Sequence, residues 1–388
     1  MEVTPETNQQ SNANSIYANA SSDRILSVQS HVAFGYVGGK AAVFPLQCMG
    51  YDVDIVNTVN FSNHTGYGSF GGTKTTAEEL TKIFDFMDIA GVLTPDRLLT
   101  GYIPNAASLD TLHQLVRKLK ARNPDLIYLL DPVLGDSGKL YVAEDVIPVY
   151  RKMLPLSTII APNWFEVETL TDIKLTDLDS IRRALFKLHA EYRVPNVVIS
   201  SIPLSRISAS IPGYLLPHEY FVAPPNGVQG NETRSTTPDE QQYLLCIASS
   251  INPTFETGSP LSTVYAGCVS LIPGYFSGVG DLFSALLLGH FRPHSVVSAS
   301  PLQNSKLPCP LATATAHALS KTHAVLSLTR ASASIDSLPL TDDELDAADP
   351  QRKSKRMKGR ELRLIQGQDI FRSKDPVEEM RVWEEFWN

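Results

Sequence analysis

The sequence has few cysteines, no long apolar run and no excess of basic charge, and each shortage excludes a class of protein. Only four cysteines occur among 388 residues, and without a CxxC pair they indicate reduced thiols rather than a disulfide framework or a zinc site. The net charge of −8 argues against nucleic-acid binding, which usually needs a basic surplus. The longest apolar run, 282–288, is far shorter than the roughly 20 residues of a membrane helix. We therefore expect a cytoplasmic protein that binds neither nucleic acid nor membrane.

Two familiar nucleotide-binding motifs are also missing in usable form. The chain has no GxxxxGK[ST] phosphate loop. A literal GxGxxG stands at 66–71, but the strand expected before it ends about eight residues earlier, which is too far for the tight turn of a dinucleotide site. If the protein binds a nucleotide, it must therefore do so through another sequence motif.

From residue 24 onward, short apolar runs alternate with longer amphipathic stretches, which is typical of βα units that build a parallel sheet. We expect strands at 24–29, 52–58, 98–103, 126–130, 158–161 and 196–200. We expect helices at 39–49, 76–87, 106–121, 145–153, 164–171, 179–192, 281–290 and 312–328. The segments 243–249 and 263–271 are predicted to close the sheet as antiparallel strands.

Composition divides the chain into one domain and two flanking segments. Residues 1–22 are rich in Asn, Ser and Gln without an apolar signal region, which predicts a disordered lead. Residues 23–340 form the predicted domain, with insertions near 202–262 and 292–312. The segment 341–388 is charge-segregated, and we expect it to pack partly on the domain. Its basic block at 352–360 is either a solvated face or a nuclear-import or partner segment, and both interpretations stay open.

The turn Gly278-Val279-Gly280-Asp281 stands directly before an apolar helix. Free backbone N–H groups and the positive end of the helix dipole attract an anion at such a place. Asp281 is well placed to take a proton from a hydroxyl that attacks the bound anion. A plain N-cap is the alternative, because aspartate is also a good cap.

Polar side chains follow two further strands. Asp131 and Asp136 follow 126–130, at the edge where open α/β sheets bind ligands and where carboxylates can hold Mg²⁺. A pair of aspartate turns is the alternative. Asn163 and Glu166 follow the next strand with the spacing of a capping box, and a water-mediated contact to metal and phosphate is the second interpretation.

Together these blocks resemble the pyridoxal kinases, vitamin B6 salvage enzymes of the ribokinase-like superfamily. The resemblance rests on motifs in family order at 27–32, 35–38, 44–47, 61–67, 99–102, 131–136, 162–166 and 278–281, and 361–366 is similar to the family's C-terminal end. It implies an α/β fold with three α/β/α layers around a mostly parallel sheet with antiparallel edge strands. It also implies transfer of the ATP γ-phosphoryl group to the 5′-hydroxyl of pyridoxal, pyridoxine or pyridoxamine, in a homodimer.

The resemblance assigns a role to individual residues. Asp281 is expected to be the catalytic base, and Gly278 to Asp281 the anion-binding turn. The vitamer pocket is expected to include Ser30, His64, Thr65, Tyr102, Gly278 and Asp281. ATP is expected to contact Asp131, Tyr141, Asn163, Glu166, Ser200, Ser201, Ile272, Pro273, Gly274, Val279 and Gly280. Asp136 and Glu166 are expected to be tied to Mg²⁺, with a monovalent cation, K⁺ or Na⁺, near the phosphates.

Two residues depart from the family pattern. Val279 and Ala161 each stand where the family often has a threonine, so a hydroxyl near the phosphates is lost and the use of a monovalent cation is in doubt. Two other functions compete. A hydroxymethylpyrimidine kinase would share the closing glycine-aspartate turn, but the blocks Ser30-His31 and Asn63-His64-Thr65-Gly66 favour pyridoxal. A non-catalytic carrier or sensor of pyridoxal would not need Asp281.

Overall fold

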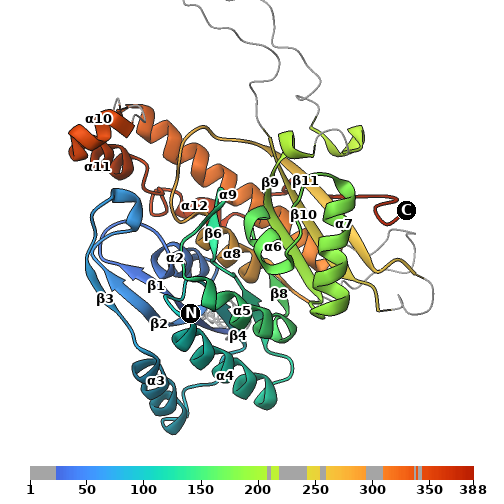
Figure 1. Cartoon of the computed structure of the whole chain (residues 1–388), viewed down its shortest axis with the longest axis horizontal. Helices are drawn as coiled ribbons and strands as arrows, with labels where there is room; N and C mark the ends of the chain where they lie inside the picture. Colours follow the sequence, from blue (N-terminus) through green and yellow to red (C-terminus); the bar gives the residue numbers. More distant parts are fainter. Residues whose placement is uncertain are drawn as a thin grey trace, which may run out of the picture.

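The computed structural model describes residues 23–207, 211–217, 243–253, 259–293, 309–335, 338–339 and 343–388. The predicted lead at 1–22 and large parts of the insertions predicted near 202–262 and 292–312 lie outside these residues. Within the described part, one ten-stranded sheet runs through the molecule and helices cover both of its faces (Figure 1).

The sheet is parallel in its middle and antiparallel at its edges, as predicted. From edge to edge its strands are β12 (Arg381–Val382), β11 (Ser262–Ser270), β10 (Tyr243–Ile251), β9 (Asn196–Pro203), β8 (Ile159–Ile160), β5 (Ile127–Leu130), β4 (Arg97–Thr100), β1 (Arg24–Val32), β2 (Asp52–Phe61) and β3 (Gly72–Lys74). The strands from β9 to β2 are parallel, and the others pair antiparallel with their neighbours. A separate hairpin, β6 (Gly135–Asp136) and β7 (Lys139–Leu140), follows β5. The short strands β3, β6, β7 and β12 were not predicted, because two or three residues leave no alternation to read.

The helices form the two outer layers. One layer holds α2 (Gly39–Cys48), α8 (Val279–His290), α9 (Pro310–Ile335) and α12 (Gln368–Arg372). The other holds α3 (Ala77–Ile89), α4 (Ala106–Arg122), α5 (Ile147–Met153), α6 (Trp164–Thr171) and α7 (Leu178–Phe186). Two helices, α10 (Asp343–Ala348) and α11 (Pro350–Gly359), lie over the end of the molecule that carries β1, β2 and β3 (Figure 1).

Single turns complete the description. They are the 3₁₀ turns η1 (Thr65–Tyr67), η2 (Glu144–Val146), η3 (Leu154–Leu156), η5 (Leu204–Arg206) and η7 (Gly213–Leu215), and the π-helical turn η4 (Lys187–Glu191). Two predicted helices are shorter than expected, because 145–153 is divided between η2 and α5, and 179–192 between α7 and η4. No helix within the described residues is both long and apolar enough to cross a membrane.

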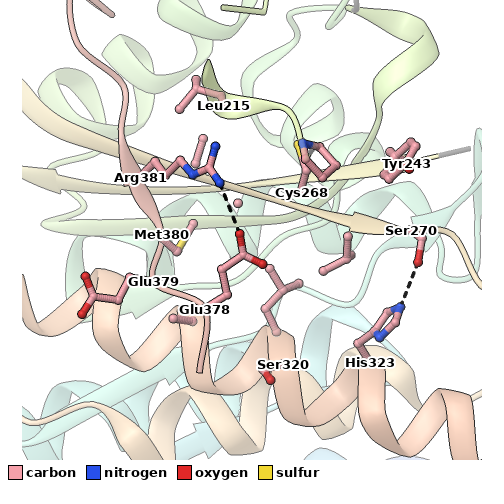
Figure 2. A pocket seen from close by; sticks show the side chains of 16 residues that line it. Leu215, Tyr243, Cys268, Ser270, Ser320, His323, Glu378, Glu379, Met380 and Arg381 are labelled. Atoms are coloured by element: carbon pink, nitrogen blue, oxygen red, sulfur yellow. Dashed lines mark hydrogen bonds and ion pairs between the residues drawn. The ribbon is translucent and has the colours of Figure 1, made fainter. Parts of the chain in front are cut away.

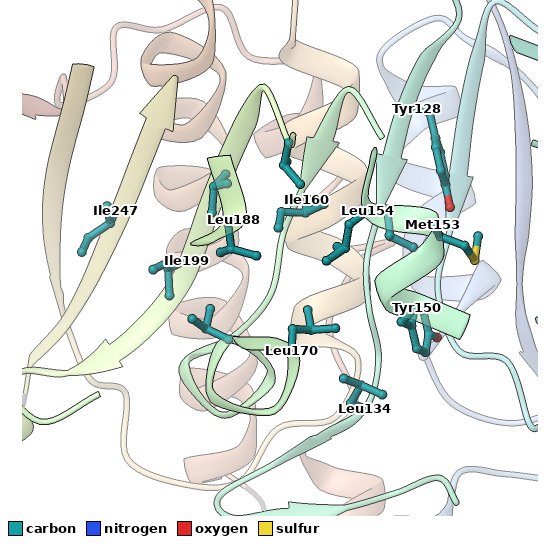
Figure 3. Close-up of a cluster of buried hydrophobic side chains, with 14 of the residues drawn as sticks. Tyr128, Leu134, Tyr150, Met153, Leu154, Ile160, Leu170, Leu188, Ile199 and Ile247 are labelled. Carbon is teal, nitrogen blue, oxygen red and sulfur yellow. The ribbon is translucent and has the colours of Figure 1, made fainter. Parts of the chain in front are cut away.

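Successive residues of the central strands feed two separate cores. Leu98 packs on one face of the sheet while Leu99 packs on the other, and Tyr128 and Leu129 divide in the same way. This follows from the alternation of side chains along a strand. Figure 3 shows the first core, where Tyr128, Ile160 and Ile199 of the sheet meet side chains of the helical layer. Because both faces are covered in the middle of the sheet, the central strands β5 and β8 carry no charged residue.

The strand order places a site at the carboxyl ends of the central strands. The chain passes from β1 to β2 on one side and then crosses to β4 on the other side of β1. Such a reversal leaves a crevice beyond the carboxyl ends of the neighbouring strands, where ligands bind in open α/β sheets. The predicted site residues lie in the last half of β1 and of β9, in the segments after β2, β4, β5 and β8, and between β11 and the first turn of α8.

Candidate active site

Asp281 lies in the first turn of α8, and its carboxylate faces the start of another helix. The N-cap of α8 is Gly278, so Asp281 is the third residue of the helix. Its Oδ2 accepts a hydrogen bond of 2.8 Å from the backbone N–H of Gly38, which is the N-cap of α2. The alternative of a plain N-cap is therefore wrong, because the carboxylate at the start of α8 accepts from the N-terminus of α2 instead.

Two glycines allow this close approach. Gly38 has φ of 55°, and a Cβ built on it would lie 2.2 Å from Ser30 Oγ. Gly278 has φ of 81°, and a Cβ there would lie 2.1 Å from the carbonyl oxygen of Tyr36. Any side chain would clash in both places, and positive φ is unfavourable for other residues. The segment after β1 thus touches α8, and Gly38 contacts both Ser30 and Asp281.

The carboxyl groups around this point lie in a poorly solvated environment. Burial raises the pKa of Asp281, and the hydrogen bond from Gly38 opposes that rise. Asp131, which follows β5, is 6% exposed, and its Oδ2 accepts a hydrogen bond of 2.8 Å from Ser284 Oγ of α8. Burial and the nearby charge of Asp281 raise the pKa of Asp131 to about 7, although the Ser284 hydroxyl lowers it. Asp131 is therefore no simple turn residue.

Asn163 and Glu166 form the predicted capping box at the start of α6. The two Glu166 oxygens accept from Leu134 N at 3.0 Å and from Asn163 N at 2.9 Å, and Asn163 Nδ2 donates to Gly135 O at 2.8 Å. Burial and the charge of Asp131 raise the pKa of Glu166 well above its usual range, against these backbone donors. The pair thus holds the loop after β5 in position.

The hairpin after β5 lies beside the loop that leads into α8. Asp136 Oδ1 accepts a hydrogen bond of 2.7 Å from Ser137 N. This contact is the one expected if Asp136 stabilises a turn, which was the alternative interpretation of this residue. The pKa of the Tyr141 phenol is raised by burial, by the adjacent Tyr275 hydroxyl and by the charges of Asp136 and Glu166. Tyr141 therefore links the hairpin to the segment 271–278, which contains Ile272, Pro273 and Gly274.

The predicted vitamer residues after β2 and β4 divide between buried and exposed positions. His64 is 8% exposed and caps η1, with Nδ1 accepting from Gly66 N at 3.2 Å. Thr65 is exposed on the same turn. Tyr102 is partly buried, and burial raises its pKa. The GxGxxG run begins no helix: Gly66 lies in η1, and α3 starts only at Ala77.

Ser200 and Ser201 lie in β9, where its pairing with β10 shifts register between Ile199 and Ile202. Ser200 N donates 3.0 Å to Pro162 O, so β9 adjoins the loop that carries Asn163. Arg360 of the C-terminal segment lies near Gly274. Its guanidinium carbon is 3.4 Å from the position that a Cβ on Gly274 would occupy.

Three contributors to the site were not assigned a role from the sequence: Gly38, Ser284, and Glu361, whose Oε1 lies 3.1 Å from His64 Nε2. Gly38 belonged to a glycine-rich block, and Glu361 to the short segment that resembles the family's C-terminal end. Ser284 stands one helical turn after Gly280, so the helical period alone could have placed it near the site.

The carboxylates of Asp131, Asp136 and Glu166 suit a divalent cation that keeps bound waters better than one coordinated entirely by protein side chains. No group of three or more His, Cys, Asp or Glu side chains within the described ranges forms a closed metal site. Asp131 and Glu166 nevertheless interact electrostatically, and Asp136 and Glu166 both act on Tyr141. Mg²⁺ usually keeps several waters and is held by one or two carboxylates together with substrate phosphates. The donor set therefore fits Mg²⁺ that arrives with a nucleotide.

A separate cavity of about 430 Å³ lies at the outer edge of the sheet. It is bounded by β11, α9 and the segment before β12, and it contains the ion pair of Arg381 with Glu378 and the hydrogen bond between Ser270 and His323 (Figure 2). None of the predicted site residues lines it, so we do not assign the reaction to it.

Comparison with known proteins identifies the family. Residues 50–223 match a family model described as phosphomethylpyrimidine kinase. The chain is 38% identical over 267 residues to the pyridoxal kinase of Arabidopsis thaliana, covering 69% of this chain and 73% of that protein. It is 36% identical over 354 residues to a putative pyridoxal kinase of Saccharomyces cerevisiae, covering 90% and 95%.

A solved structure agrees. The pyridoxal kinase from Leishmania donovani in complex with ADP and pyridoxamine superposes with a TM-score of 0.67 at 28% identity, over 93% of this chain and 99% of that one. The crevice beyond β1, β4 and β5 and the turn before α8 thus occur in a chain whose relatives are kinases. The chain belongs to the pyridoxal kinase family.

Proposed function

We propose that this chain transfers the γ-phosphoryl group of ATP to the 5′-hydroxyl of a B6 vitamer, with Asp281 as the general base. Membership of the pyridoxal kinase family supports the activity. Solved relatives hold ADP together with pyridoxamine or pyridoxine. The observation that carries the assignment of the base is the carboxylate of Asp281, held by Gly38 N at 2.8 Å beside Ser30 and at the start of α8.

The surroundings of Asp281 suit proton transfer. Burial raises its pKa and so strengthens the carboxylate as a base, while the Gly38 N–H favours the ionised form. A base works best when its pKa lies near the working pH, and a positioned one contributes typically 10²- to 10⁴-fold in rate. The 5′-hydroxyl would donate its proton to Asp281 as it attacks the phosphorus atom.

The helix start would neutralise the moving phosphoryl group. The N–H groups of Val279, Gly280 and Asp281 have no acceptor within α8, because the first turn of any helix lacks partners for them. Together with the helix dipole they form a preorganised anion site. The amide of Val279 is retained although the family's frequent threonine hydroxyl is not. Phosphoryl transfer depends mainly on such positioning and charge neutralisation.

ATP and Mg²⁺ would lie across the ends of β5, β8 and β9. Asp131, Asp136 and Glu166 are the carboxylates that would hold Mg²⁺ through water, and a bound Mg²⁺ neutralises phosphate charge. Tyr141, Asn163, Ser200, Ser201 and the segment from Ile272 to Gly274 would contact the nucleotide. A monovalent cation near the phosphates would receive no side-chain oxygen from Ala161.

We also propose a cytoplasmic homodimer with each active site inside one subunit. All four cysteines are free thiols, which is usual in a reducing compartment. Sedimentation or light scattering of the purified chain would test the dimer.

The proposal is tested by incubating the protein with Mg-ATP and each of pyridoxal, pyridoxine and pyridoxamine, with hydroxymethylpyrimidine as a fourth substrate. We expect the 5′-phosphate of at least one vitamer. Phosphorylation of the pyrimidine alone would support the sister kinase, and ATP binding without ADP release would support a carrier. Asp281→Asn should keep vitamer and ATP binding and lower kcat at least about 10²-fold. Unchanged kcat would remove Asp281 from the mechanism.

A further inference from the structure

We propose that Glu361, near the start of the last segment of the chain, is a positioning residue that fixes the orientation of His64 toward the vitamer. The inference rests on the proposed function, because it treats His64 as part of the vitamer pocket. Glu361 touches no reacting atom and would act only through the loops that it holds.

One buried carboxylate receives three donors from two loops of the site. Glu361 is 6% exposed; its Oε2 accepts from Tyr36 N at 2.8 Å, and its Oε1 accepts from Tyr67 Oη at 2.9 Å and from His64 Nε2 at 3.1 Å. Tyr36 belongs to the segment after β1, and the other two belong to the segment after β2. These loops lie about 300 residues from Glu361 along the chain.

The arrangement selects one tautomer of His64. A carboxylate only accepts hydrogen bonds, so the proton must be on Nε2, which leaves Nδ1 as an acceptor. On that side Gly66 N donates to Nδ1 at 3.2 Å, and Ser277 Oγ lies 3.4 Å away. Ser277 directly precedes Gly278, so the ring of His64 connects Glu361 to the turn that opens α8.

The position of Glu361 is itself rigid. A Cβ on Gly35, which has φ of 93°, would lie 2.5 Å from Glu361 Oε1, so the loop can pass over the carboxylate only at a glycine. The next residues are anchored, because Leu362 and Leu364 are fully buried and Arg363 N donates 3.1 Å to Thr329 Oγ1. Although burial opposes it, the hydrogen bonds from His64, Tyr36 and Tyr67 keep the pKa of Glu361 below its usual value. The carboxylate is thus a fixed, ionised acceptor.

A Glu361→Gln variant tests this with little change in volume. The glutamine amide retains one acceptor oxygen but presents N–H groups to donors, so the tautomer and the ring orientation of His64 are no longer imposed. We expect the KM for the vitamer to rise about tenfold, since hydrogen bonds to charged groups are among the stronger ones. The KM for ATP should stay within about twofold of wild type, because the three donors to Glu361, which are Tyr36, His64 and Tyr67, are not among the residues expected to contact ATP.

Two readouts separate positioning from a general loss of structure. Glu361→Gln and His64→Ala should be non-additive, with the double variant no worse than His64→Ala for the vitamer KM. Nitrogen-15 NMR of labelled histidine should show the Nε2–H tautomer of His64 in the wild type and a mixed or altered signal in Glu361→Gln. Asp369→Asn is the matched control, because its carboxylate is 98% exposed in the same segment, and it should change neither constant.

The outcomes distinguish this inference from the proposed function. If the wild type phosphorylates no vitamer, the proposed function fails and the inference falls with it. If the wild type is active but Glu361→Gln keeps its vitamer KM, or loses affinity for both substrates equally, only the inference is overturned. Additive effects in the double variant would overturn it as well, even if Glu361→Gln unfolds at a lower temperature.

Discussion

Asp131 is a carboxyl group whose position costs stability at neutral pH. Burial and the charge of Asp281 raise its pKa from 3.8 to about 7 in the folded protein. Between about pH 4 and pH 7 the folded state therefore binds a proton that the unfolded state has released. The free energy of unfolding must fall as pH rises through this window. Above about pH 7 Asp131 is ionised in both states, and the full cost of burying its charge is present. Sites that gather like charges for chemistry often carry such a cost.

We predict that Asp131→Asn raises the free energy of unfolding by about 2–3 kcal/mol more at pH 8 than at pH 5, because the wild-type protein loses about 1.4 kcal/mol for each of the two pH units between pH 5 and pH 7. The amide oxygen can still accept from Ser284, so only the buried charge is removed. Urea unfolding of both proteins without nucleotide, at the two pH values, measures the difference. Asp369→Asn, which changes an exposed carboxylate, serves as the control. A pH-independent difference would show that the charge of Asp131 is not responsible.

At the scale of one element, the first turn of α8 contains two glycines, but only one of the two positions requires a glycine. Gly278 has φ of 81°, and the carbonyl oxygen of Tyr36 occupies the space of a Cβ, whereas a Cβ on Gly280 would meet nothing within 4 Å. Gly278→Ala should lower the free energy of unfolding by roughly 1–3 kcal/mol through backbone strain and displacement of the 33–38 segment. It should also lower kcat, because the contact of Gly38 with Asp281 depends on that approach.

Gly280→Ala provides the matched comparison in the same turn. Alanine has a better helix propensity than glycine, so its stability should equal or exceed that of the wild type by up to about 1 kcal/mol. Urea unfolding followed by circular dichroism measures both variants. Equal losses for the two alanines would mean that the turn tolerates no side chain at all, and the specific role of Gly278 would be wrong.

Sequence patterns predicted the elements of the fold better than they predicted contacts between them. The apolar strand at 126–130 and the amphipathic helix at 106–121 were found because their patterns are local. The capping box of Asn163 and Glu166 was also foreseeable from spacing. Asp281 was placed correctly at a helix start, but its partner Gly38 lies 243 residues away. No periodicity carries such information, and Glu361 was missed for the same reason.

At the scale of the whole molecule, the last residues complete the sheet and one core. Trp383 and Phe386 are 3% and 2% exposed, and both pack in the first core, which also contains Tyr128 and Ile160. Strand β12 covers part of the edge of β11, with Val382 opposite Tyr265. Trp387 Nε1 donates 2.9 Å to Ser262 O and fixes the segment at its far end. These contacts tie the chain's last residues to a strand more than a hundred residues earlier.

We predict that a chain ending at residue 380 loses at least about 4 kcal/mol of unfolding free energy, because removing one buried aromatic side chain already costs about 3–5 kcal/mol. The exposed edge of β11 would also promote aggregation. Urea unfolding should be followed by circular dichroism, because the deletion removes Trp383 and Trp387 from a chain that has three tryptophans. Val382→Thr, at a position 38% exposed, should stay within about 0.5 kcal/mol of wild type. If the shortened chain unfolds at the same urea concentration as the full chain, the segment is a surface addition and not part of the core.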